Sequence, residues 1–132
     1  MPLKAIIIDA SAVARGLLNT VLTEGGYEVA GTTHTMAQGI ALATKYHPQI
    51  ICIAREQIED GSTQAAELRA KMPKSLIFMV SGAIDAATIQ TSLALGINGF
   101  VVKPFRADAV LKTIRTAVLA LVRKQQDATG GR

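Results

Sequence analysis

Gln49-Ile50-Ile51-Cys52-Ile53-Ala54 is an apolar, largely β-branched run near the middle of a chain of 132 residues. A short continuous run of this kind is typical of a strand that is buried on both faces of a parallel sheet. In open parallel sheets, ligands and chemistry lie at the carboxyl ends of the strands, near the point where the strand order reverses. The run reaches that end at Ala54, whose methyl group has no reactive atom.

Runs of the same kind recur along the chain, and they predict five strands at residues 4–9, 27–32, 50–54, 76–81 and 100–102. Apolar residues at helical spacing predict a helix after each strand, with starts near Ser11, Thr35, Ser62, Asp85 and Ala107. Residues 55–61 are expected to form a loop. The alternation predicts one doubly wound α/β domain, a five-stranded parallel sheet with helices on both faces.

The domain is expected to cover residues 1–125, because the last helical pattern ends at about Gln125. Residues 126–132 are expected to form a flexible C-terminal tail. No apolar run approaches the about 18 residues that cross a bilayer, so we expect a soluble, cytoplasmic protein without a membrane partner. Whether the chain is complete or part of a larger regulator is left open.

Composition excludes several classes of function. Aromatic residues make up 4% of the chain, and the net charge of +4 is dispersed, so this domain is not expected to bind nucleic acid. Cys52 is the single cysteine, which excludes an internal disulfide and a multi-cysteine metal site. We expect a buried, inert thiol there. His34 and His47 have no companion ligands nearby in the sequence and predict no metal site.

Five short segments are expected at the carboxyl ends of the strands: Asp9-Ala10-Ser11, Thr33-His34, Ala54-Arg55-Glu56, Ser81-Gly82 and Lys103-Pro104. With the runs at residues 6–9, 79–81 and 99–105, this set resembles the receiver domain of bacterial response regulators, the CheY-like domain. The resemblance covers about residues 3–122. It implies a flavodoxin-like (βα)5 fold with strand order 2-1-3-4-5.

The resemblance also implies a phosphoryl-transfer site. Active receivers accept a phosphoryl group from a histidine kinase on an aspartate that ends the third strand. Two acids that end the first strand hold a magnesium ion, and a hydroxyl and a lysine contact the phosphoryl oxygens. Such a site needs oxygen ligands for the metal and fixed donors for the developing charge.

Compared residue by residue, the match to this site is partial. Asp9 fits the first acid of the first strand, but the second acidic position is Ala10, and the acceptor position is Ala54. Ser81 fits the hydroxyl position and Lys103 fits the lysine position. Two of the three carboxylates are therefore missing, including the only nucleophile.

Two further positions belong to this comparison. Phe100 fits the aromatic switch position that couples to the hydroxyl in the family. Ile58 stands where the family commonly has a proline, in a loop that is one residue short before Asp60-Gly61. These departures indicate a degenerate receiver, a pseudo-receiver, in a two-component or phosphorelay signalling protein. We expect no enzymatic activity, no cofactor and no metal.

The remaining pocket residues allow alternatives. Asp9 and Lys103 are expected to form a structural ion pair across the pocket. Glu56 either joins them as a second carboxylate or points into solvent. Ser81 and Phe100 either form a two-position switch, or Ser81 bonds locally while Phe100 packs in one rotamer. The resemblance implies a cis Lys103–Pro104 bond, which proline makes accessible.

The leading hypothesis is a phosphorylation-independent protein-interaction module. Its partner is expected to be a signalling protein or an output domain. A homodimer is also possible, through the face formed by the fourth helix, the fifth strand and the last helix, which carries Leu119 off its apolar stripe. The alternative is a conventional receiver that is inactivated by substitution at Ala54. A flavin- or cobalamin-binding enzyme is disfavoured, because the residues at 9–13 provide neither a phosphate loop nor a histidine.

Overall fold

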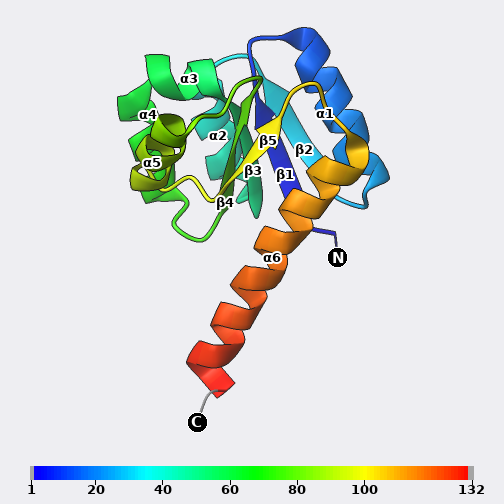
Figure 1. Ribbon diagram of the computed structural model, residues 1–132, viewed down its shortest axis with the longest axis vertical. Helices are drawn as coiled ribbons and strands as arrows, with labels where there is room; N and C mark the ends of the chain where they lie inside the picture. Colours follow the sequence, from blue (N-terminus) through cyan, green and yellow to red (C-terminus); the bar gives the residue numbers. More distant parts are fainter. Residues whose placement is uncertain (1, 131–132) are drawn as a thin grey trace.

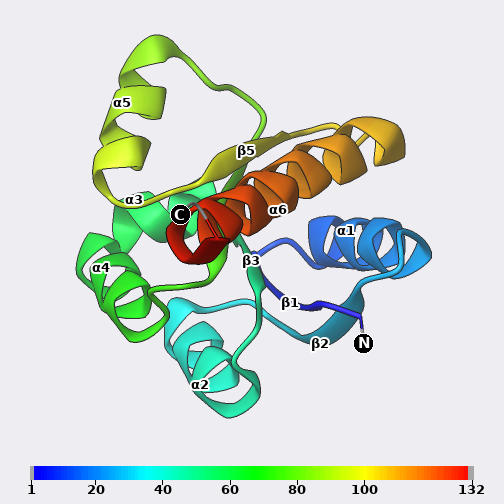
Figure 2. The same ribbon diagram turned by 90° about the horizontal axis from the view of Figure 1, so that it is seen from below.

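The computed structural model describes residues 2–130 and contains one five-stranded sheet with helices on both faces, as Figures 1 and 2 show. The strands are β1 Lys4–Ile8, β2 Glu28–Thr33, β3 Ile50–Ala54, β4 Leu76–Ser81 and β5 Gly99–Val102. The helices are α1 Ala12–Glu24, α2 Met36–Tyr46, α3 Arg55–Asp60, α4 Ser62–Lys71, α5 Ala86–Ala94 and α6 Ala107–Gly130.

All neighbouring strands are parallel, and their order is β2-β1-β3-β4-β5. The predicted fold and strand order are therefore confirmed. The order reverses between β1 and β3, which places the carboxyl ends of these two strands side by side, with Ile8 opposite Ile53. Every residue of β3 is buried, as the continuous apolar run predicts for a central strand.

Alternate residues of β3 belong to two separate hydrophobic cores. Ile51 and Ile53 pack with residues of α2 and α4 on one face of the sheet. Ile50 and Cys52 pack with residues of α1 and α6 on the other face. This division follows from the two-residue period of a strand, and Figure 2 shows the two sets of helices on opposite sides of the sheet.

Side-chain caps fix three helix starts that the sequence predicts. The side chains of Ser11, Thr35 and Asp85 each accept a hydrogen bond from the backbone N–H three residues further along. A cap of this kind satisfies one of the free N–H groups at a helix amino terminus. All three of these helices, α1, α2 and α5, begin at the carboxyl edge of the sheet, just after β1, β2 and β4.

The prediction of a loop at residues 55–61 is wrong, because most of this segment forms the short helix α3. No glycine or proline interrupts the segment Arg55–Asp60, and Ile58 is buried in the core that contains α2 and α4. The burial of this one side chain supplies a tertiary contact that local sequence patterns do not reveal. The chain therefore has six helices within the described residues, where five are predicted.

The last helix is also longer than predicted. It continues past Gln125 to Gly130, so part of the predicted tail at residues 126–132 is helical. The reason is local, since no glycine or proline occurs between Ala107 and Thr129. Residues 131 and 132 lie outside the described residues. Within the described chain, no helix combines the length and apolar character that a membrane span requires.

Arg69 joins two backbone segments at the amino-terminal edge of the sheet. Its guanidinium donates to the carbonyl oxygens of Met72 and Ser75, which follow α4, and to that of Gly96 before β5. It also donates to Asn98 Oδ1 at 3.1 Å. Partial burial lowers the pKa of Arg69 from its usual value. This side chain therefore stabilises connections that lie far from the carboxyl edge.

Replacing this guanidinium should destabilise the fold. We expect Arg69→Met to lower the free energy of unfolding by about 2–4 kcal/mol, because partly buried carbonyl groups lose a charged donor. Urea unfolding followed by circular dichroism measures the change. The control Lys112→Met alters an exposed residue of α6 and should change stability by about 0.5 kcal/mol or less. Equal effects of the two substitutions would contradict this role of Arg69.

Cys52 should be unreactive in the folded protein. Complete burial in β3 raises the pKa of its thiol to about 12, so the reactive thiolate is scarce in mildly alkaline buffer. We expect no labelling by uncharged N-ethylmaleimide in native buffer and full labelling in denaturant, measured by mass spectrometry. Rapid native labelling without unfolding would show that β3 is accessible.

Candidate functional site

The site lies at the carboxyl edge of the sheet, where four strands deliver residues of different chemistry. Asp9 follows β1, Ala54 ends β3, Ser81 ends β4 and Lys103 follows β5. The parallel pairing of β1, β3, β4 and β5 brings these ends to one edge. The sequence-predicted pocket is therefore assembled by the register of the sheet.

Asp9 and Lys103 form the predicted ion pair across this edge. Lys103 Nζ lies 3.1 Å from Asp9 Oδ2, and the Ser11 N–H donates to Asp9 Oδ1 at 2.9 Å. The carboxylate is nearly buried, at 7% exposure, whereas the ammonium side chain is 31% exposed. Arg15 Nη1 also donates to the Asp9 carbonyl oxygen at 2.7 Å. Both carboxylate oxygens of Asp9 therefore have partners from the protein itself.

Ala54 lies at the centre of this edge and is 1% exposed. It also precedes the first turn of α3 without any side-chain cap. Ala10, at the other acidic position that the resemblance implies, is exposed after β1. A methyl group has no lone pair for a metal or a phosphoryl group, so neither position provides a ligand or a nucleophile.

Magnesium, which the resemblance to receivers implies, does not fit this donor set. The metal prefers near-octahedral oxygen coordination, and a protein site with one carboxylate relies on further oxygen donors such as substrate phosphates. Asp9 supplies the single carboxylate, and Lys103 already balances its charge at 3.1 Å. Within residues 2–130, no group of three or more His, Cys, Asp or Glu side chains is arranged to hold a metal ion.

Glu56 is exposed in the first turn of α3. In the described part of the chain, no hydrogen bond or ion pair joins its carboxylate to Asp9 or Lys103. Of the two alternatives for this residue, the structure agrees with the one that points into solvent.

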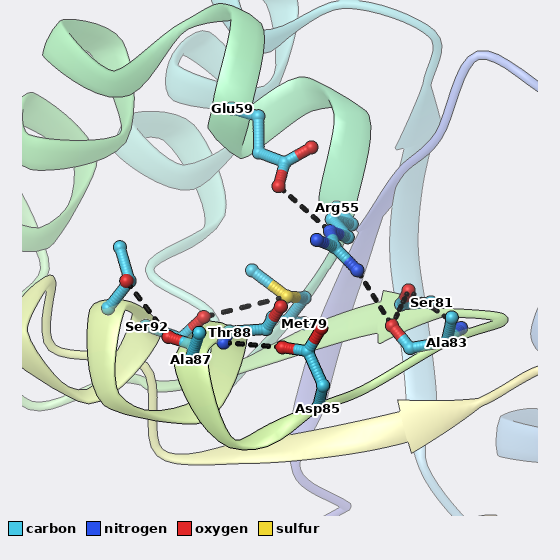
Figure 3. A network of polar contacts seen from close by, with 10 residues as sticks. Arg55, Glu59, Met79, Ser81, Ala83, Asp85, Ala87, Thr88 and Ser92 are labelled. Atoms are coloured by element: carbon cyan, nitrogen blue, oxygen red, sulfur yellow. Dashed lines mark hydrogen bonds and ion pairs between the residues drawn. The ribbon is translucent and has the colours of Figure 1, made fainter.

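Arg55 is the site residue that sequence reasoning missed. Its Nη1 donates to the Ala83 carbonyl oxygen at 2.7 Å, and its Nε pairs with Glu59 Oε2 at 2.8 Å. Figure 3 shows Arg55 reaching from α3 to the loop that follows β4. The hydrogen bond that Arg55 donates to Glu59, together with the nearby carboxylates, raises the pKa of Arg55. The spacing of Arg55 and Glu59 was visible in the sequence, but the backbone partner in the other loop was not.

Ser81 makes local hydrogen bonds within the same loop. Its Oγ donates to the Ala83 carbonyl oxygen at 2.8 Å and accepts from the Ala83 N–H at 3.2 Å. Ser81 and Arg55 therefore converge on one carbonyl group, as Figure 3 shows. Ser81 is buried, so its hydroxyl requires a hydrogen-bond partner, and the Ala83 carbonyl group provides one. The bond from Arg55 to the same carbonyl group holds the loop after β4 close to α3.

The aromatic position and the proline bond complete the edge. Phe100 is half-buried and packs against the core that contains α2 and α4. The Lys103–Pro104 peptide bond is cis, as the resemblance implies. The two histidines stay apart from this pocket: His34 is exposed after β2, and His47 ends α2 in a left-handed conformation with φ of 46°.

A sequence profile of the response regulator receiver domain matches residues 5–115 of this chain. The chain belongs to the response regulator receiver domain family. Bacillus subtilis chemotaxis protein CheY is 27% identical over 112 residues, which cover 84% of this chain and 93% of that protein. This receiver domain is therefore similar in extent to a CheY-like protein of two-component signalling.

Two further comparisons extend this result. An Archaeoglobus fulgidus protein-glutamate methylesterase/protein-glutamine glutaminase is 29% identical over 129 residues, which cover 96% of this receiver domain and 36% of that protein. The crystal structure of a CheY-like receiver domain protein from Methanospirillum hungatei has a TM-score of 0.82 at 18% identity. It covers 94% of this chain and 99% of that structure, and it supports the fold alone.

The ion pair leads to a prediction about stability. Lys103→Met should lower the free energy of unfolding by about 2 kcal/mol, because it leaves the nearly buried Asp9 carboxylate without its cation. The double variant Asp9→Asn/Lys103→Met should be more stable than Lys103→Met by about 1 kcal/mol, since it removes the unpaired charge. Urea unfolding of the four proteins in this cycle measures the coupling. Strictly additive effects would show that the two groups do not stabilise each other.

Proposed function

We propose that this receiver domain is a pseudo-receiver that acts as a phosphorylation-independent protein-interaction module in the cytoplasm. The observation that carries the proposal is Ala54, a buried methyl group at the end of β3 where the family resemblance implies the acceptor carboxylate. A phosphoryl acceptor must offer a nucleophilic oxygen, and this position has none. The module has no catalytic role of its own.

The charges around Ala54 support the same proposal. Lys103, which would contact phosphoryl oxygens in an active receiver, pairs here with Asp9 at 3.1 Å. The hydroxyl of Ser81 is held by Ala83, and the same carbonyl group accepts from Arg55. The pocket therefore satisfies its own polar groups without a metal or a phosphoryl group, which favours one fixed conformation.

A fixed conformation suits a docking role, and we propose a surface for it. Leu93 of α5, Val102 of β5 and Leu119 of α6 are each at least half exposed. These three elements form the face on which the family resemblance leads us to expect a partner or a second copy of the chain. We assign this face to a signalling protein, an output domain or a homodimer, and we assign neither nucleic acid nor membrane to it.

The alternative is a conventional receiver that substitution at Ala54 has inactivated. The observation that favours it is the retention of Ser81 at the end of β4, of Phe100 within β5 and of Lys103 directly after β5. Ala10 disfavours it, because restoring the acceptor alone leaves the magnesium site one carboxylate short.

Beryllofluoride, a phosphoryl mimic that attaches to an acceptor aspartate, separates these functions. We expect backbone amide NMR spectra of the whole chain to be unchanged around Ala54, Ser81 and Lys103 when magnesium and beryllofluoride are added. The physical reason is the missing nucleophile and the poor metal site. Saturable shifts at these amides would contradict the proposal and would show that the pocket still senses an anion or a metal.

Two variants serve as matched controls. Ala54→Asp restores the acceptor alone, and Ala10→Asp/Ala54→Asp also restores the second acid. If the amide signals of the double variant shift and those of the unsubstituted chain do not, the experiment can detect beryllofluoride binding in this fold. A full response of Ala54→Asp alone would favour the inactivated conventional receiver.

A further inference from the structure

A groove lies at the opposite end of the strands from Ala54, between α6 and the amino-terminal edge of the sheet. Its volume is about 510 Å³, and its apolar lining includes Leu3, Met72, Leu76, Val118, Leu121 and Val122. Figure 1 shows α6 running well past this edge of the sheet, and Figure 2 shows the same end from below. The projecting helix forms one wall of the groove.

The wall contributed by α6 is a regular apolar stripe. Val118, Leu121 and Val122 follow the i, i+3, i+4 spacing that places side chains on one face of a helix. Val118 and Leu121 are partly buried against the core that contains α1, whereas Val122 is 41% exposed. The stripe therefore begins in the core and continues into the groove, where solvent reaches it. A concave apolar surface of this kind is typical of a binding site.

The titratable side chains in the groove are all basic or neutral. Among the described residues, its lining contains Lys71, Lys74 and His47 and no carboxylate. Lys71 also reaches Glu67 at 3.2 Å, but both groups are about half exposed, so this pair is weak and leaves the ammonium accessible. Arg123 and Lys124 follow Val122 directly in the sequence. The groove is thus apolar inside and cationic at its rim.

This charge distribution disfavours a second copy of the chain as the occupant. In sequence, α6 carries the basic residues Lys112, Arg115, Arg123 and Lys124 against the acids Asp108 and Asp127. Two copies that docked through this groove would bring cationic rims and a basic helix together. Like charges at an interface suppress association, whereas an acidic partner would be attracted.

We propose that this groove docks an amphipathic peptide segment of a partner protein. Apolar side chains of the segment fill the space beside Val122, and its carboxylates pair with Lys71 and Lys74. The inference rests on the proposed role as an interaction module, because it names the chemistry of the partner. It assigns this segment to a second surface, separate from the α5–β5–α6 face and remote from the phosphorylation pocket.

Three synthetic helical peptides test the proposal. They share one leucine stripe and carry Glu, Gln or Lys at the flanking positions, and each is titrated into the labelled whole chain. We expect the Glu peptide to shift the amides of Leu3, of Met72, of residues 74–76 and of residues 118–125 in a saturable manner. The Gln peptide should bind about ten-fold more weakly, since two exposed ion pairs are lost, and the Lys peptide should not bind.

Matched variants locate the contact. Val122→Gln alters the groove, whereas Leu17→Gln makes a similar change on an exposed residue of α1 that neither lines the groove nor belongs to the α5–β5–α6 face. Lys74→Glu reverses a charge at the rim, and Lys112→Glu makes the same net change elsewhere. We expect the two groove variants to weaken binding of the Glu peptide about five-fold and the two controls to change it less than about two-fold.

Several results would overturn the proposal: no saturable shifts, shifts confined to other surfaces, equal binding of the Glu and Lys peptides, or equal effects of groove and control variants. A dimer in sedimentation velocity that protects the groove amides would also overturn it in favour of self-association. These results are separable from the phosphorylation test. A silent pocket with no peptide binding refutes this docking site alone, whereas a beryllofluoride response refutes the phosphorylation-independent role.

Discussion

The ion pair between Asp9 and Lys103 is the interaction on which the carboxyl edge of this receiver domain depends. A nearly buried carboxylate is costly unless it is paired, and here one ammonium group and one backbone N–H satisfy it. The pair also connects the residue after β1 with the residue after β5, so it spans the strands between them. With Ala54 at the centre, the edge contains one buried anion and one cation that balances it.

The loops around this pair are held in a related way. Arg55 reaches from α3 to the carbonyl group of Ala83, and the buried hydroxyl of Ser81 bonds to the same group. Each connection uses a polar group of the chain itself, so the start of α3 and the loop after β4 are joined by the protein's own side chains. The hydrogen bonds and the ion pair of these residues therefore surround Ala54, which itself has only a methyl group. The apolar groove lies at the other edge of the sheet, where Arg69 bonds the carbonyl groups of Met72 and Ser75 in its lining.

Much of the fold could be predicted from local patterns. Continuous β-branched runs identified the buried strands, and Ser11, Thr35 and Asp85 identified helix starts through their capping chemistry. The same patterns failed at residues 55–61, where the burial of Ile58 against α2 and α4 supports a helix too short to stand alone. They also ended α6 too early, because no glycine or proline marks the predicted boundary near Gln125.

The candidate site shows the same division. The pocket residues at the strand ends, from Asp9 to Lys103, could be predicted from the sequence, because the carboxyl ends of parallel strands lie at one edge of the sheet. The distant partners of Arg55 and Arg69 could not be predicted from the sequence, since these side chains bind the carbonyl groups of Ala83 and Gly96, more than twenty residues further along the chain. Any residue type presents such a carbonyl, so no sequence pattern marks it. The sequence by itself determined where the strands lie along the chain, which residues cap the helices and that position 54 has only a methyl group. Tertiary structure alone decided which backbone groups meet the long cationic side chains, because those contacts depend on how the loops approach one another in space.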